Sequence, residues 1–314
     1  MLIKLNETFL PTLKVGSYEK ILKERSKIEV CLLDSYDLNC DKKYFRAVHR
    51  MDSFMYPMNR ERVSEIEKNS GIIICCFNDW LKACECSMDA AISAGAVAFK
   101  TGLAYNRNLK FERVTKSEAE KEYNILFEMN RNPIWQTEMG VPSGKKFQDY
   151  MMHYIMQLAN KRKLVYQIHT GLFAGKGSRL ENSNPQLLTN LFIDYPDVKF
   201  DIFHIGYPFE HTLAALSKMF PNVYIDMCWA HVISPTSSVN ALLEFLDSVP
   251  ICKINGFGGV SLFLDAVYGH QVMARENISK ALSIKVEENV FTMKQAKDYA
   301  KKMLYDNPVE LFRL

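Results

Sequence analysis

Long apolar runs and an excess of charge of either sign are both missing from this sequence. Its apolar runs are as short as residues 72–77, whereas a membrane-spanning helix needs about 20 apolar residues. The 39 basic and 36 acidic side chains leave a net charge of +3, which predicts neither nucleic acid nor a membrane surface as a partner. With 48% hydrophobic and 24% charged residues, the composition is that of a globular protein and excludes disordered and fibrous classes.

Cofactor, redox and export signatures are missing as well. No glycine-rich dinucleotide fingerprint and no P-loop follows an expected strand, and residues 171–177 lack the final Gly-Lys-Ser/Thr of a phosphate loop. Residues 84–86 read Cys-Glu-Cys rather than Cys-x-x-Cys, so we expect the eight cysteines to be reduced structural thiols. Lys4, Asn6 and Glu7 interrupt the apolar core that a signal peptide needs, which predicts a cytoplasmic protein.

What the sequence does contain is an alternation of short apolar runs with longer helical stretches. A period of about 25 residues is visible in residues 195–201 and 220–226, where a helix ends at proline and a strand follows. Such strand–helix units predict a parallel sheet, as a barrel first and a doubly wound sheet second. Seven runs are apolar at nearly every position, as strands buried on both faces are: Ile28–Asp34, Arg46–Arg50, Ala96–Lys100, Leu164–His169, Lys199–His204, Val223–Cys228 and Ile251–Asn255.

Helices are expected over residues 117–130, 147–162 and 286–304. Ser117 and Glu120 have the spacing of a capping box at the start of the first helix. The run Asp306-Asn307-Pro308 predicts a stop after the last helix.

Two histidines end successive expected strands, and this pattern predicts a metal site. Ligands of parallel α/β folds bind beyond the carboxyl ends of the strands. His169 and His204 lie there, each followed within two residues by glycine. Neutral imidazole is a common zinc ligand, and the alternative is a pair of hydrogen-bonded core histidines. The candidates for substrate contact are Lys100, Tyr105, Arg107, Gln167, Asp226, Trp229, His231 and His270.

The first three of these candidates favour an anionic substrate, such as a carboxylate. Arg107 would bind it through two nitrogens, and a solvated surface position is the alternative for this arginine. Lys100 would bind a substrate carboxylate, bridge metals as a carbamate or pair with an acid.

Several motifs, taken together, resemble the amidohydrolase superfamily. The closest branch is that of aminocarboxymuconate-semialdehyde decarboxylase-like and uronate isomerase-like proteins, and the resemblance covers about residues 28–314. The motifs are Ala96–Lys100 with Ala104-Tyr105, Gln167–Gly171, Phe203–Pro208, Asn222–Trp229 with Ile233–Pro235, Gly256–Gly259, Tyr268–His270 with Ala274-Arg275, and Asn307-Pro308.

The resemblance implies a metal-dependent TIM barrel of the (β/α)8 type. It would form one domain over residues 1–314, with a helical lead-in at 1–27 and a C-terminal helix at 286–314. His169 would be the metal ligand from the fifth strand and His204 that from the sixth. A divalent ion, zinc above all, would activate water for attack on a small substrate that carries a carboxylate.

Two departures from the family pattern limit this reading. The family's first strand carries His-x-His, which occurs nowhere in this sequence, and its last strand is followed by Gly-Gly-Asp where this chain has Val260. The barrel is therefore expected to lack its first strand. Asp226, Cys228 or His231 could complete the metal site, although nothing in the sequence requires it.

Three readings stay open: a hydrolase (or a decarboxylase or uronate isomerase), a degenerate barrel that binds a ligand or partner without turnover, and a shortened form of a longer protein. Open sheet edges further predict that residues 2–13 or a partner chain, as in a homo-oligomer, cover the gap.

Overall fold

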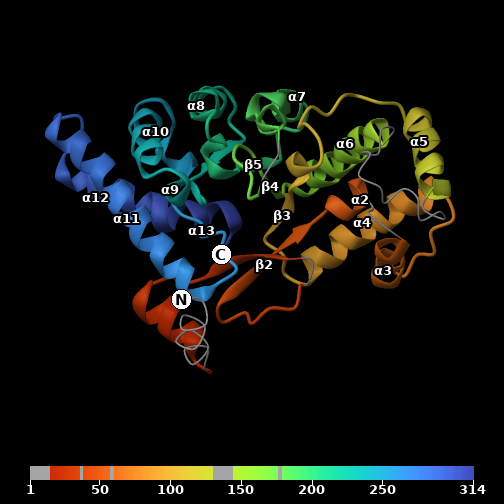
Figure 1. The fold of residues 1–314 in the computed structure, drawn as a ribbon, viewed down its shortest axis with the longest axis horizontal. Helices are drawn as coiled ribbons and strands as arrows, with labels where there is room; N and C mark the ends of the chain where they lie inside the picture. Colours follow the sequence, from red (N-terminus) through yellow and green to blue (C-terminus); the bar gives the residue numbers. More distant parts are fainter. Residues whose placement is uncertain (1–14, 36–37, 57–59, 130–143, 176–178) are drawn as a thin grey trace.

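A single sheet of seven parallel strands forms the centre of the protein (Figure 1). The structure, a computed structural model, describes residues 15–35, 38–56, 60–129, 144–175 and 179–314. The strands follow one another in chain order: β1 (Cys31–Ser35), β2 (Phe45–Arg50), β3 (Ala98–Thr101), β4 (Val165–Ile168), β5 (Lys199–Ile202), β6 (Val223–Asp226) and β7 (Ile254–Asn255). All seven strands that the apolar runs predict are present, which confirms the parallel sheet.

Helices connect the strands from β2 onward and cover the outside of the sheet. Figure 1 shows α3 to α6 gathered at one end of the molecule and α10, α11 and α12 at the other, with α7 and α8 between them. The longer helices are α3 (Arg60–Ser70), α4 (Phe77–Ser93), α5 (Lys116–Met129), α6 (Lys145–Arg162), α8 (Glu210–Met219), α10 (Pro235–Ser248), α11 (Leu264–Glu287) and α12 (Met293–Lys301). The shorter ones are η2 (Glu19–Arg25), α2 (Asp52–Met55), η3 (Leu103–Tyr105), η5 (Leu180–Ser183), η6 (Pro185–Leu188), α7 (Thr189–Asp194), η7 (Phe203–Gly206), α9 (Ala230–Ile233), η8 (Ile251–Lys253), η9 (Lys302–Asp306) and α13 (Asn307–Phe312).

The sheet curls without closing, so the fold is an incomplete TIM-barrel-like α/β barrel, as predicted. Within the described residues, β1 pairs only with β2 and β7 pairs only with β6. The free edge of β7 is capped by the C-terminal helices: Gly256 N–H donates to the Met303 carbonyl at 2.8 Å, and the Asn307 amide donates to the carbonyls of Ile251 and Ile254 at 2.7 and 2.8 Å. Residues 2–13 lie outside the described residues, so their predicted role at the gap stays a prediction.

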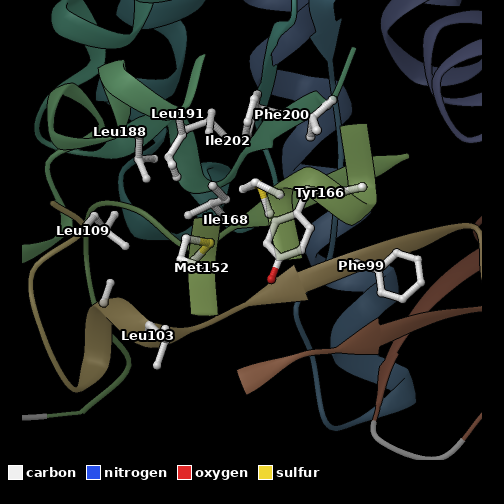
Figure 2. Packing of buried hydrophobic residues seen from close by; sticks show 14 of the residues in the cluster. Phe99, Leu103, Leu109, Met152, Tyr166, Ile168, Leu188, Leu191, Phe200 and Ile202 are labelled. Atoms are coloured by element: carbon white, nitrogen blue, oxygen red, sulfur yellow. The ribbon is translucent and has the colours of Figure 1, made fainter. Parts of the chain in front are cut away.

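An apolar floor covers the inner face of β2 to β4 on the side of their amino ends. Val48, Ala98 and Val165 of β2 to β4 are buried there against Leu311 and Phe312 of α13, and these five residues are called the floor below. The alternate strand residues point outward and pack under the helices. Figure 2 shows two such layers meeting, the outer residues Phe99, Tyr166, Ile168, Phe200 and Ile202 of β3 to β5 and the helical residues Met152, Leu188 and Leu191.

The helix predictions need three corrections. The continuous helix over residues 286–304 is wrong, because α11 ends at Glu287 and α12 begins at Met293, where Thr292 and Gln295 form a capping box. Pro308 does not stop a helix: it occupies the first turn of α13, where its missing N–H needs no partner. The capping box of α5 is formed by Thr115 and Glu118, two residues before the predicted pair.

Membrane helices were not expected from the short apolar runs. Among the described residues, no helix is long and apolar enough to cross a membrane.

Candidate metal and substrate site

One residue from each strand builds a polar layer above the floor, toward the carboxyl ends of the strands. Val48 and Arg50, Ala98 and Lys100, and Val165 and Gln167 are two positions apart, so each pair points to the same inner face of the sheet. The polar layer, a term used below for these seven residues, consists of Asp34, Arg50, Lys100, Gln167, Asp201, Asp226 and Asn255. The described barrel therefore has an apolar lower layer and a polar upper layer.

The cationic side of the polar layer is held together by one carboxylate. Asp34 accepts two hydrogen bonds from Arg50 at 2.7 Å each, and Lys100 Nζ lies 2.9 Å from its Oδ2. Burial alone would raise the pKa of Asp34, but the hydrogen bond from Arg50 and the charge of Lys100 lower it to about 2. Of the two cationic side chains, Lys100 is 6% exposed and Arg50 is 32% exposed, so Arg50 is the one that a solute in the barrel mouth can reach.

The acidic side of the polar layer contains two carboxyl groups that are hydrogen-bonded to each other. Asp201 accepts from the Gln167 amide at 3.0 Å and from the Asn255 amide at 3.1 Å, while Asp226 accepts from the Cys228 N–H at 2.7 Å. Burial raises the pKa of Asp201 to about 6 and, together with the charge of Asp201, raises the pKa of Asp226 well above its usual range. The two carboxyl groups therefore share a proton at neutral pH.

His169 and His204 meet at the carboxyl ends of β4 and β5, as the sequence predicts. His204 Nε2 lies 3.1 Å from His169 Nδ1. The opposite nitrogens face backbone carbonyls: His169 Nε2 lies 3.1 Å from the Leu172 oxygen, and His204 Nδ1 lies 2.7 Å from the Cys228 oxygen. Burial, first of all, lowers the pKa of His169 to about 2 and that of His204 to about 3, so both rings are neutral at pH 7.

The positions of the protons on the two rings determine what this pair of histidines can bind. A carbonyl only accepts hydrogen bonds, so His169 Nε2 and His204 Nδ1 each carry the single proton of a neutral ring. The facing nitrogens then present two lone pairs to each other at 3.1 Å. An ion bound at about 2.0–2.1 Å from each nitrogen can span a separation of up to about 4 Å, so the two histidines fit a divalent cation such as zinc.

The backbone around His204 is strained, which is common at functional sites. His204 and the β-branched Ile205 have φ values of 64° and 52°, in the left-handed region that such residues rarely adopt. Gly171, two residues after His169, packs directly on this turn: a Cβ there would lie 2.5 Å from the Tyr207 oxygen and 2.6 Å from the Gly206 carbonyl carbon. The His-x-Gly spacing thus lets the two histidine loops touch.

Aromatic rings and two further histidines complete the mouth of the barrel. The Tyr105 ring lies 4.6 Å from the His169 ring, and the Trp229 ring lies 5.4 Å from the His204 ring. His231 Nε2 donates to the Gly256 carbonyl at 3.0 Å and His270 Nδ1 donates to the Gly259 carbonyl at 2.6 Å. Both histidines therefore anchor the loop after β7.

The same loop supports His204. Trp229 N–H donates to the Gly258 carbonyl at 2.7 Å. A Cβ on Gly258 would lie 2.6 Å from the Cys228 sulfur, so only glycine lets the loop pack against the residue whose carbonyl accepts from His204.

The expected supplementary ligands make other contacts, and Cys228 meets His204 only through its backbone carbonyl. Asp226 is occupied by Asp201 and the Cys228 N–H, and His231 by Gly256. Val260 has a φ of 36° and a side chain without a donor atom, at the position where the family pattern has aspartate. Across the described ranges, no group of three or more His, Cys, Asp or Glu side chains could hold a metal ion.

Arg107 lies outside the polar layer. It forms an ion pair with buried Asp149 at 2.6 Å, contacts the Gln148 amide oxygen at 3.2 Å and covers the Phe111 ring. Its predicted contact with substrate stays a prediction. Sequence reasoning missed Asp34, Arg50 and Asp201, although a charged residue inside an apolar run, such as Asp201 between Phe200 and Ile202, is a signal that could have found them.

Comparisons with known proteins agree with this architecture. Residues 133–254 match the model of the amidohydrolase family. Protein fluG of Emericella nidulans is 25% identical over 234 residues, which cover 72% of this chain and 26% of fluG. The chain thus spans about a quarter of the length of this curated relative.

Solved structures share the fold at low sequence identity. Uronate isomerase of Thermotoga maritima has a TM-score of 0.75 at 18% identity, covering 93% of this chain and 69% of its own. Glucuronate isomerase of Caulobacter crescentus has a TM-score of 0.72 at 18% identity, covering 98% and 69%. A proposed metal-dependent hydrolase of Lactobacillus casei has a TM-score of 0.75 at 17% identity, covering 95% and 76%.

The match of residues 133–254 to the amidohydrolase family model agrees with the resemblance seen in the sequence. The barrel of its structural relatives confirms the fold class, with the sheet left open in the described residues.

Proposed function

We propose that this chain binds a divalent metal ion, zinc in the first place, through His169 and His204 and acts as a hydrolase-type enzyme on a small substrate that carries a carboxylate. The observation that carries the proposal is the 3.1 Å separation of His204 Nε2 and His169 Nδ1, while the opposite nitrogen of each ring faces a backbone carbonyl. When bound, such an ion lowers the pKa of a water molecule and polarises a carbonyl group. The structural relatives described as a metal-dependent hydrolase and as uronate isomerases support the family's chemistry.

The chain's own residues supply binding and orientation. The carbonyls of Leu172 and Cys228 fix the tautomers of the two rings, so that their free nitrogens face the same space. Arg50, which is partly exposed beside Asp34, would attract the substrate carboxylate, and Tyr105 and Trp229 would line its path. Isomerisation or decarboxylation at the same site is the alternative reaction class. We also predict that the protein is cytoplasmic and forms a homo-oligomer.

Metal analysis of purified protein tests the proposal. Protein purified from cells grown with zinc and manganese is expected to contain one equivalent of metal by mass spectrometry. The His169→Ala variant and the His204→Ala variant are each expected to lack this metal. His211→Ala is the matched control, because this histidine is 85% exposed and pairs with Glu244 rather than with His169 or His204. Wild-type protein without metal would contradict the proposal.

A degenerate barrel that binds a ligand or partner without turnover is the second candidate. It is favoured by Val260, whose side chain can neither bind a metal nor carry a proton. Val260→Asp separates the two candidates: a tenfold or larger gain in zinc affinity would show that this position limits the site. An unchanged affinity would place the defect elsewhere, at the first strand that the described sheet lacks.

A further inference from the structure

A chain of hydrogen bonds runs from Asp201 to Asp226 and through Cys228 to His204. Asp226 accepts the Cys228 N–H at 2.7 Å, and the carbonyl of the same Cys228 accepts from His204 Nδ1 at 2.7 Å. Asp226 therefore acts on the histidine through one residue of backbone rather than by contact. Both carboxyl groups are buried inside the barrel, where solvent does not compete for these bonds.

The donors around the two acids decide which one carries the shared proton. Asp201 receives an amide N–H on each oxygen, from Asn255 on Oδ1 and from Gln167 on Oδ2. Asp226 receives a single N–H, from Cys228 on Oδ1. Two donors stabilise the charged form of Asp201 more than one donor stabilises that of Asp226, so the proton resides on Asp226 and is donated to Asp201.

We propose that Asp226 is a positioning residue for His204: as a neutral carboxylic acid it donates to Asp201, accepts from Cys228 N–H and so holds the Cys228 carbonyl against His204 Nδ1. This arrangement keeps the proton of His204 on Nδ1 and leaves the Nε2 lone pair facing His169. The inference rests on the proposed function where it concerns metal binding, but the tautomer of His204 in the metal-free protein does not depend on it.

The neutral state of Asp226 makes a sharp prediction about two substitutions. In Asp226→Asn the amide group donates to Asp201 and its oxygen still accepts from Cys228, so the chain of hydrogen bonds is kept. In Asp226→Leu, which keeps the branched shape but is bulkier and apolar, both bonds are lost. Asp201→Asn disrupts the same chain of hydrogen bonds at a second point, because its amide would direct N–H groups at the donor of Gln167 or Asn255.

Two measurements on the folded, full-length chain test the proposal, with circular dichroism as the check on folding. Nitrogen-15 NMR of metal-free protein reports the tautomer of His204, and competition with a chelator reports the zinc affinity. Asp226→Asn is expected to keep the Nδ1–H tautomer and a zinc affinity within about threefold of wild type. Asp226→Leu and Asp201→Asn are expected to mix the tautomers and to weaken zinc binding about 10–100-fold.

Two results would overturn the proposal. One is a loss of zinc affinity in Asp226→Asn as large as that in Asp226→Leu, which would mean that Asp226 acts through a negative charge rather than as a neutral acid. The other is a wild-type tautomer in both Asp226→Leu and Asp201→Asn. If wild-type protein binds no zinc, the proposed function fails while the tautomer measurement still decides the role of Asp226.

Discussion

The floor and the polar layer lie on the same strands, two residues apart, yet they are specified by different physics. In the floor, apolar side chains of β2 to β4 fill space against Leu311 and Phe312. In the polar layer every charged side chain has a partner of opposite charge or a hydrogen bond, as Asp34 shows with Arg50 and Lys100. The lower layer is selected by shape and the upper one by the balance of charges and protons.

This difference explains where a barrel of this kind tolerates chemistry. Buried polar groups are costly unless they are satisfied, so a site for an ion or a carboxylate needs a complete network around it. The floor provides the apolar packing that lets such a network lie above it. Substitutions in the two layers should therefore differ in size and in their dependence on pH.

The largest effect is expected from Phe312→Ala in the floor. Removal of a buried phenylalanine costs about 3–5 kcal/mol, because transfer and cavity terms add. Urea denaturation would measure this loss as a decrease in the free energy of unfolding relative to wild type. The decrease should be the same at pH 5 and at pH 8. Leu314→Ala, at a partly exposed position, is the control and should cost well under 1 kcal/mol.

A smaller, pH-dependent effect is expected from Asp34→Asn in the polar layer. The pKa of Asp34 is lowered from 3.8 to about 2 in the folded protein. Its charge therefore stabilises the fold fully at pH values above the unfolded-state pKa of 3.8, and this contribution is lost as the pH falls through about 2. At pH 7 the variant should lose about 2 kcal/mol. The difference from wild type should shrink below pH 4. A difference that stays constant down to the lowest pH at which the protein folds would contradict the ion-pair account.

The smallest effect is expected from Val165→Thr, which places in the floor the kind of polar group that the layer above it accommodates. The substitution keeps the volume and places a hydroxyl group in the floor, where the apolar neighbours Val48 and Leu311 offer it no partner. A loss of about 1–2 kcal/mol in thermal or urea unfolding is expected. Valine to threonine at half-exposed Val290 should change the free energy of unfolding by no more than about 0.5 kcal/mol. Equal losses at Val165 and Val290 would show that the floor does not penalise a buried hydroxyl group.

The strands could be predicted because strands buried on both faces leave continuous apolar runs, and the strand ends then located His169 and His204. The helix boundaries near Pro308 and Ser117 could not, because the same residues favour both the end and the start of a helix. Asp201 escaped prediction because its role depends on Gln167 and Asn255, which other strands bring to it. Arg107 resembles a loop arginine in sequence, and only the fold shows its partner Asp149.

The floor also bears on the order in which the barrel can assemble. Val48 and Leu311 are in the same cluster although 263 positions separate them (311 − 48), so their contact closes a very long loop and carries a large entropic cost. Contacts of this range form slowly. During synthesis the early strands must therefore wait for α13 before their lower ends are covered, and a nascent chain that stops short of it would present those apolar ends to other proteins.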